Sequence, residues 1–307
     1  MSWTWYFRHM YENRAMLRSP GAYAEYVQRM GAESQAAYFL QNSARAGAYP
    51  EDPDGGWRYR FERLPVHDKL LQAYGLNAVA RQGEPFARAL RVMDWFCAHT
   101  WYNGMSFWSG WLFQPFYKGK LVDSLRVLRY ACDKPFSHSI NCGHKAIVFA
   151  DCLMATGICA MPVSIQNYTY RPEEEKVTPC PNHVVVHAWL PEERRWVMLD
   201  PSFNSYIADE KGRALNLMEI HERHRRGESL SVAQYSFNGT QDCRKEYLEG
   251  FVLGGLLEIA TWNGTDRKGG LRSRLLPEDV PPKDDKMRDI AVAELLAEPQ
   301  TGEVAGI

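Results

Sequence analysis

The strongest pattern of hydrophobic and polar positions in the chain lies in residues 142–157 and is helical. Its apolar side chains recur every three or four positions: Ala146, Phe149, Ala150 and Leu153. Such spacing predicts a buried helix, and Gly157 is a typical stop signal after it. The helix would begin at Cys142, where the positive end of the helix dipole favours the thiolate form of a cysteine.

Two segments downstream have the apolar character of β-strands. The first covers residues 183–189, and the second covers residues 195–200 after a charged loop. A thiol, an imidazole and a carboxylate therefore follow one another on a predicted helix and two predicted strands. This order indicates a nucleophile, Cys142, with a histidine as its base and Asp200 as the acid that orients the base.

Three blocks carry this pattern. They are the helix from Cys142 that ends in Gly-Ile at 157–158, the strand that starts with histidine, and Trp-Val-Met-Leu-Asp-Pro at 196–201. Together they resemble the transglutaminase-like superfamily, a branch of the papain-like cysteine enzymes, and residues 206–220 resemble a bacterial subgroup of it. The resemblance implies an α+β fold with a papain-like core, in which the helix of the nucleophile packs on a small antiparallel sheet.

Two histidines on the first predicted strand, His183 and His187, share one face and compete for the role of base. A two-residue turn in the hairpin would place His187 opposite Asp200, whereas a four-residue loop at 190–193 would place His183 there. Pro191 cannot donate a ladder hydrogen bond, so it favours the longer loop. The resemblance also favours His183, because superfamily members commonly have a histidine followed four positions later by an acidic residue. His187 occupies that acidic position here.

An oxyanion formed during attack by Cys142 needs hydrogen-bond donors, and the backbone N–H of Cys142 is the expected first one. The second would come from upstream, where an aromatic stretch at 101–117 is interrupted by glycines and predicts a loop. This loop either covers a core or forms a wall of the substrate cleft. The candidates in it are Trp101, Trp108, Trp111 and Gln114.

The remaining cysteines and histidines allow other interpretations. Cys152 and Cys159 fall on the apolar side of the helix and on the strand after it, which predicts core packing. Cys180, His183 and His187 are residue types that suit zinc, but prolines flank Cys180 and no second pair of ligands has fixed spacing. We therefore expect neither a metal nor an organic cofactor.

These features predict an enzyme that transfers an acyl group from an amide through a cysteine thioester, with a peptide or another amide as its substrate. Water as the acceptor would make it a peptidase or amidase, and an amine would make it a transamidase. The alternative is a non-catalytic peptide-binding or scaffold module of the same fold. Arylamine acetyl transfer is less similar, because the Arg-Gly-Gly-x-Cys motif of those enzymes is absent before Cys142.

Composition narrows the classes of partner and the cellular compartment that we expect for this protein. The 36 basic and 37 acidic residues nearly cancel, which argues against a nucleic-acid partner. The N-terminus lacks the pattern of a signal peptide, and no apolar run is long enough to span a membrane. Seven cysteines without framework spacing fit reduced thiols, so we expect a cytoplasmic protein. The oligomeric state does not follow from the sequence.

Turn-rich and proline-rich stretches divide the chain into three parts. We expect an N-terminal helical extension and linker at 1–56, a transglutaminase-like domain at 57–262, and a loosely held tail at 263–307. Helices are predicted at 5–46, 67–81, 84–100, 121–132, 214–226 and 243–260.

Overall fold

Helices and strands both build the part of the chain that the structure describes, and the fold is α+β. The structure is a computed structural model, and it describes residues 58–102, 117–118, 121–135, 138–166, 168–171, 176–179, 183–238, 244–256, 258–262, 264–267, 270–274, 288–289 and 292–301. Within these ranges, no helix combines the length and the apolar character needed to cross a bilayer. The helices predicted at 5–46 and most of the aromatic loop lie outside the described residues.

The α-helices agree with the predicted ones in most places. They are α4 (Pro65–Tyr74), α5 (Leu76–Ala80), α6 (Pro85–His99), α7 (Ser124–Asp133), α8 (Cys142–Ala155), α9 (Leu217–Arg225), α10 (Arg244–Glu246) and α11 (Val292–Leu295). The helix predicted at 67–81 is two helices, because Gly75 between them has a left-handed φ of 59°. The helices predicted at 84–100, 121–132 and 214–226 are present as α6, α7 and α9, with ends shifted by a few residues.

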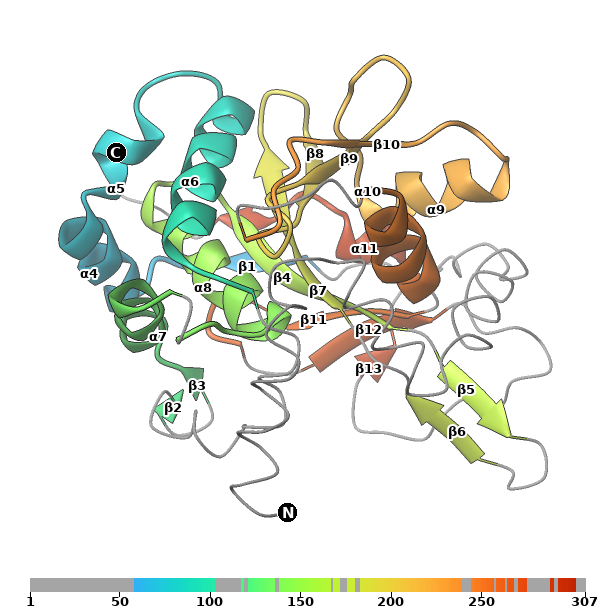
Figure 1. The fold of residues 1–307 in the computed structure, drawn as a ribbon, viewed down its shortest axis with the longest axis horizontal. Coiled ribbons are helices and arrows are strands. Elements are labelled where there is room, and N and C mark those ends of the chain that lie inside the picture. The colour runs from blue at the N-terminus through green and yellow to red at the C-terminus, as the bar shows by residue number, and fades with distance from the viewer. Residues whose placement is uncertain are drawn as a thin grey trace.

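A six-stranded sheet crosses the middle of the molecule in the order β13-β12-β11-β4-β7-β8 (Figure 1). Its strands are β4 (Ala160–Gln166), β7 (His183–Leu190), β8 (Arg195–Leu199), β11 (Glu258–Trp262), β12 (Gly270–Arg274) and β13 (Arg288–Asp289). Neighbouring strands are antiparallel except β12 and β13, which are parallel.

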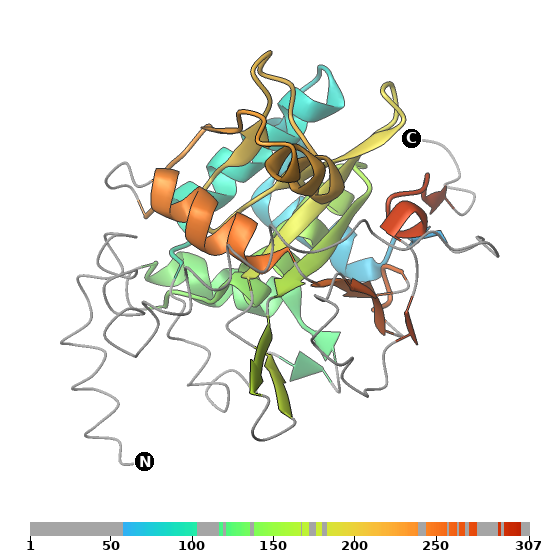
Figure 2. The same cartoon turned by 90° about the vertical axis from the view of Figure 1, so that its right-hand side faces the viewer.

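Among the described residues, eight further strands form two-stranded pairs outside this sheet. The pairs are β1 (Arg60–Phe61) with β14 (Gln300–Thr301), β2 (Tyr117–Lys118) with β3 (Leu121–Val122), β5 (Tyr168–Arg171) with β6 (Lys176–Pro179), and β9 (Tyr206–Ala208) with β10 (Ser231–Ala233). The β5–β6 pair projects away from the rest of the fold in both views (Figures 1 and 2).

Helix α8 lies at the centre of the core. It packs on β4 and β7 of the sheet, and α4, α6 and α7 pack against it. Every residue from His144 to Ala155 is buried, because the helix has neighbours on nearly all sides. Among these contacts, the ring of Phe149 lies 5.6 Å from that of Phe96 on α6. Only the first turn of α8, with Cys142, is partly open.

The prediction of one helix at 243–260 is correct only in part. Residues 244–255 form three short helical pieces: α10, a π-helix η5 (Tyr247–Val252) and a 3₁₀-helix η6 (Leu253–Gly255). Residues 258–262 form strand β11, which lies between β4 and β12. The β-branched Ile259 and Thr261 are buried on one face of this strand and Ala260 on the other, which suits a strand covered on both faces.

The described part of residues 263–307 differs from the expected loosely held tail. Strands β12 and β13 extend the central sheet, and β14 pairs with β1 near the other end of the described chain. Leu271 and Leu295 are buried in the core. Buried apolar residues such as these are few in this segment and are surrounded by polar ones. The low apolar density of the sequence therefore gave no sign of the strands and of the core contacts.

Candidate active site

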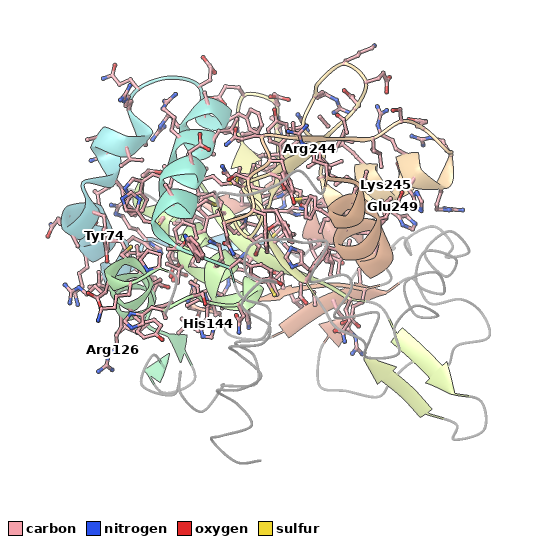
Figure 3. All side chains as sticks on the ribbon, in the orientation of Figure 1. Tyr74, Arg126, His144, Arg244, Lys245 and Glu249 are labelled. Carbon is pink, nitrogen blue, oxygen red and sulfur yellow. The ribbon has the colours of Figure 1, made fainter. Side chains whose placement is uncertain are left out.

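Cys142 is the first residue of α8, and its side chain is half-buried. The helix begins here because the side-chain oxygen of Asn141 accepts a hydrogen bond from the backbone N–H of His144, at 2.9 Å. The same oxygen accepts from Nδ1 of His144 at 3.0 Å. Burial lowers the pKa of His144 to about 4, so this ring is neutral near pH 7. Figure 3 labels His144 at this end of α8.

The first turn of α8 lies against the start of β7, which carries His183. A Cβ atom added at Gly143 would lie 4.0 Å from Cγ2 of Val184, so the helix and the strand are in van der Waals range at this point. The thiol of Cys142 lies within interaction range of the His183 imidazole. The positive end of α8 and an imidazole therefore meet at one sulfur atom.

His183 and Asp200 form a buried pair. Nε2 of His183 lies 2.6 Å from Oδ2 of Asp200, and the two side chains are 3% and 0% exposed. The other oxygen of Asp200 accepts a hydrogen bond from the backbone N–H of Ser202 at 2.8 Å. Burial lowers the pKa of His183, but the charge and hydrogen bond of Asp200, followed by Cys142, outweigh it and raise that pKa to about 10. The imidazole is therefore positively charged at neutral pH.

The hairpin that holds this pair has a register that differs from the predicted one. Trp189 pairs with Trp196, not with Arg194, and the loop covers residues 191–194 rather than 190–193. The predicted register is therefore wrong by two residues. Arg194 adopts a left-handed φ of 49° and belongs to the turn, which the sequence pattern did not indicate.

His183 nevertheless reaches Asp200, because β8 ends at Leu199. Val186 pairs with Leu199, the last pair of the ladder. Asp200 then begins a tight turn in which its N–H donates to the carbonyl of Ser205 at 2.7 Å. The two side chains meet diagonally across the end of the hairpin rather than directly opposite each other.

His187 lies apart from this pair, farther along β7. It is fully buried and sits opposite Met198. Its Nε2 accepts a long hydrogen bond of 3.4 Å from the backbone N–H of Leu217. Burial lowers the pKa of His187 to about 3, so the ring stays neutral. The structure therefore brings His183, and not His187, next to Asp200 and Cys142.

Three aromatic rings surround the His183 imidazole. Tyr102 belongs to the aromatic stretch that the sequence offers as a wall of the cleft, whereas sequence analysis did not assign Phe203 and Phe251 to the site. The ring centroids of Tyr102, Phe203 and Phe251 lie 6.4, 5.7 and 5.5 Å from that of His183, all at steep angles. They come from segments far apart in the sequence. Their apolar surfaces keep water from the His183–Asp200 hydrogen bond, which strengthens it.

Of the candidates for a second oxyanion donor, only Trp101 is among the described residues. Its backbone carbonyl accepts from the N–H of Ile140 at 3.0 Å, two residues before Cys142. The next residue, Tyr102, forms a parallel bridge with Ile140. The segment that leads into the aromatic loop therefore runs beside the segment that leads into α8. Trp108, Trp111 and Gln114 lie outside the described residues.

Metal-ligating residues do not gather in the described ranges. No group of three or more histidine, cysteine, aspartate or glutamate side chains there could hold a metal ion. The imidazole of His183 is hydrogen-bonded to Asp200, and that of His187 accepts a hydrogen bond from the backbone N–H of Leu217. Cys180, the third residue of the zinc hypothesis, lies outside the described residues.

Comparison with protein-family models, with curated proteins and with solved structures found no match for this chain.

Proposed function

We propose that this chain is a cysteine-dependent acyl-transfer enzyme that acts on an amide, with the papain-like arrangement of the transglutaminase-like superfamily. The observation that carries the proposal is the buried His183–Asp200 pair beside Cys142 at the start of α8. A thiol, a charged imidazole and an orienting carboxylate are the parts that such a reaction needs.

The reaction begins with Cys142 as thiolate and His183 as imidazolium. The sulfur forms a bond to the carbonyl carbon of the amide, and the carbonyl electrons move to the oxygen. The backbone N–H of Cys142 stabilises that oxyanion. The C–N bond then breaks, and His183 gives its proton to the departing amine, which leaves a thioester on Cys142.

The second half returns the enzyme to its starting state. Water or an amine attacks the thioester carbonyl, and neutral His183 takes the proton of the attacking group. The C–S bond breaks, so the thiolate and the imidazolium are restored. Throughout, Asp200 holds the imidazole in one orientation through its 2.6 Å hydrogen bond to Nε2.

The first test is selective alkylation of Cys142 by iodoacetamide at pH 7, mapped by mass spectrometry. We expect Cys142 to react first. Cys132 is an internal control, because it is also half-buried but burial raises its pKa to about 11. Cys97 is a second control, since burial raises its pKa to about 12. Equal labelling of these thiols would contradict a paired thiolate at Cys142.

The second test is turnover. A library of quenched peptides and amides is incubated with the protein, with and without a primary amine, and the acyl-enzyme is sought by mass spectrometry after acid quench. A thioester on Cys142 that disappears in Cys142→Ser supports the proposal. Release of free acid identifies a hydrolase, and incorporation of the amine identifies a transamidase. Peptide binding without any acyl-enzyme would support the scaffold alternative instead.

A further inference from the structure

Tyr247 is a buried residue beside the site that the reaction described above does not use. It is fully buried at the start of the π-helix η5, and its ring centroid lies 4.4 Å from that of Phe203. Phe203 belongs to the turn that follows Asp200 and also contacts His183. Phe251, on the same π-helix, contacts His183 as well. Irregular helices of this kind are common at functional sites.

The hydroxyl of Tyr247 has two candidate partners. It lies within interaction range of the Asp200 carboxylate and of the Ser205 side chain. Among the described residues, neither the Tyr247 hydroxyl nor the Ser205 hydroxyl makes a hydrogen bond of normal geometry. A buried hydroxyl without such a bond costs about 1–3 kcal/mol, so a small movement that forms one is favoured.

Asp200 has room to accept from Tyr247. A carboxylate offers about four acceptor positions, and the described donors to this one are His183 and the N–H of Ser202. Burial, followed by the charge of Asp200, raises the pKa of Tyr247 well above its ordinary value. The phenol therefore keeps its proton and acts as a donor.

We propose that Tyr247 is a positioning residue of this site: its hydroxyl donates to Asp200 and holds the carboxylate where it accepts from His183. Asp200 then has three donors from three parts of the chain, namely β7, its own turn and η5. The description of the site as catalytic rests on the proposed function, whereas the Tyr247–Asp200 contact does not.

The test is the proton NMR resonance of His183 Nε2–H, which a short hydrogen bond to a carboxylate shifts to low field. His183→Ala identifies the resonance by removing it. Tyr247→Phe deletes one donor to Asp200, so the carboxylate bonds more strongly to His183 and the resonance moves further downfield. Tyr59→Phe is the matched control, because Tyr59 is also buried but its hydroxyl interacts with Thr265.

A second variant tests the same contact through the other partner of the Tyr247 hydroxyl. The interaction with Ser205 lowers the pKa of Tyr247, so Ser205 acts as a donor to the phenol oxygen and makes the phenol a stronger donor to Asp200. In Ser205→Ala we therefore expect the His183 resonance to move downfield, in the same direction as in Tyr247→Phe and by less. An unchanged resonance in folded Tyr247→Phe, or shifts of opposite sign in the two variants, would overturn the proposal.

The result separates this proposal from the proposed function. The resonance is measured without substrate, so it reports the Tyr247 contact even if no turnover is found. An active enzyme with an unchanged resonance in Tyr247→Phe overturns the positioning role alone. Downfield shifts in both variants, in a protein that never forms an acyl-enzyme, support the contact and overturn the proposed function.

Discussion

The described part of the chain holds two buried pairs of aspartate and histidine, one at each end of α8, and they have different surroundings. Asp200 pairs with His183 at 2.6 Å beside Cys142, at the partly open start of the helix. Asp151 lies near the other end of the helix, with Nε2 of His67 at 3.4 Å from its Oδ1. Both carboxylates are essentially unexposed.

The charge of Asp151 is neutralised by groups that, among the described residues, have no counterpart around Asp200. Arg267 forms an ion pair with Asp151, and the hydroxyl of Ser124 donates to it. Burial raises the pKa of Asp151, but Arg267 and His67 outweigh it and lower that pKa to about 2. The nearest thiol in the sequence, Cys152, has its pKa raised well above normal by burial and then by Asp151.

The comparison shows that a buried histidine–aspartate contact is not in itself a sign of catalysis. The Asp151 cluster ties α4, α7 and α8 to the segment at 264–267, and its thiol stays protonated. The Asp200 pair differs because its histidine also faces a half-buried thiol at a helix start. Five predictions test this difference, from the largest expected effect to the smallest.

Cys142→Ala should abolish acyl transfer and leave the fold intact. The change removes the nucleophile, so kcat should fall by on the order of 10³ or more. Activity is measured on any substrate that the turnover screen yields, and circular dichroism checks the fold. Near-normal activity in this variant would end the cysteine-enzyme proposal.

His183→Ala should slow the alkylation of Cys142 and lower turnover by about a hundredfold or more, because the imidazolium is lost. The matched control is His187→Ala, four residues along the same strand. This variant should keep most of the alkylation rate of Cys142 and most of the turnover. The alkylation rate at pH 7 measures the effect in each. Equal losses in the two variants would point to a metal site, and metal analysis would then decide.

Asp151→Asn should destabilise the fold by about 3–5 kcal/mol, because it leaves Arg267 buried without its counter-ion. Urea unfolding gives the free energy. Alkylation of Cys142 in the folded variant should match the wild type. Asp200→Asn is the comparison, and it should slow alkylation. If Asp151→Asn slows alkylation as much as Asp200→Asn does, the two clusters are not separate in function.

Stability should also depend on acid pH through Asp151. Its pKa is 3.8 in the unfolded chain and about 2 when folded. A lowered pKa stabilises the fold at pH above 3.8, and this contribution is lost as pH falls through 2. The loss is about 2–3 kcal/mol at 1.36 kcal/mol per pKa unit. Between pH 5 and pH 2, the free energy of unfolding should change less with pH in Asp151→Asn than in the wild type. Equal slopes in the two proteins would contradict the lowered pKa of Asp151.

Cys152→Ala and Cys159→Ala should each cost roughly 1–2 kcal/mol of stability, since both side chains are buried. Neither should change acyl transfer by the folded protein. Thermal unfolding and the activity of the soluble fraction measure the two effects. Loss of chemistry in folded Cys152→Ala would mean that the Asp151 end of α8 takes part in the reaction.

The centre of the fold and three residues of the site followed from the sequence because they carry regular signals. The helix from Cys142 has apolar residues at helical spacing, and β7 and β8 are continuous apolar runs. The hairpin register did not follow, since it depends on Arg194 taking a left-handed conformation. His183 still reaches Asp200, because an imidazole at the end of the hairpin can contact the residue diagonal to it.

The aromatic neighbours of His183 and the Asp151 cluster could not be predicted in the same way. Phe203 and Phe251 come from a turn and a π-helix, neither of which has a periodic pattern. Asp151 follows an apolar run on a helix, and its partner Arg267 is more than a hundred residues away. No local spacing connects such residues, so only the tertiary structure brings them together.

The position of β11 has a consequence for how the protein is made. β11 lies between β4 and β12, although β4 to β10 precede it in the chain. A ribosome therefore releases the helix with Cys142 while one edge of β4 is still open, and an open edge invites pairing with other chains. During this interval Asp151 also lacks its ion-pair partner Arg267. Translation must pass residue 267 before the nascent chain can complete its central sheet and neutralise the buried charge of Asp151.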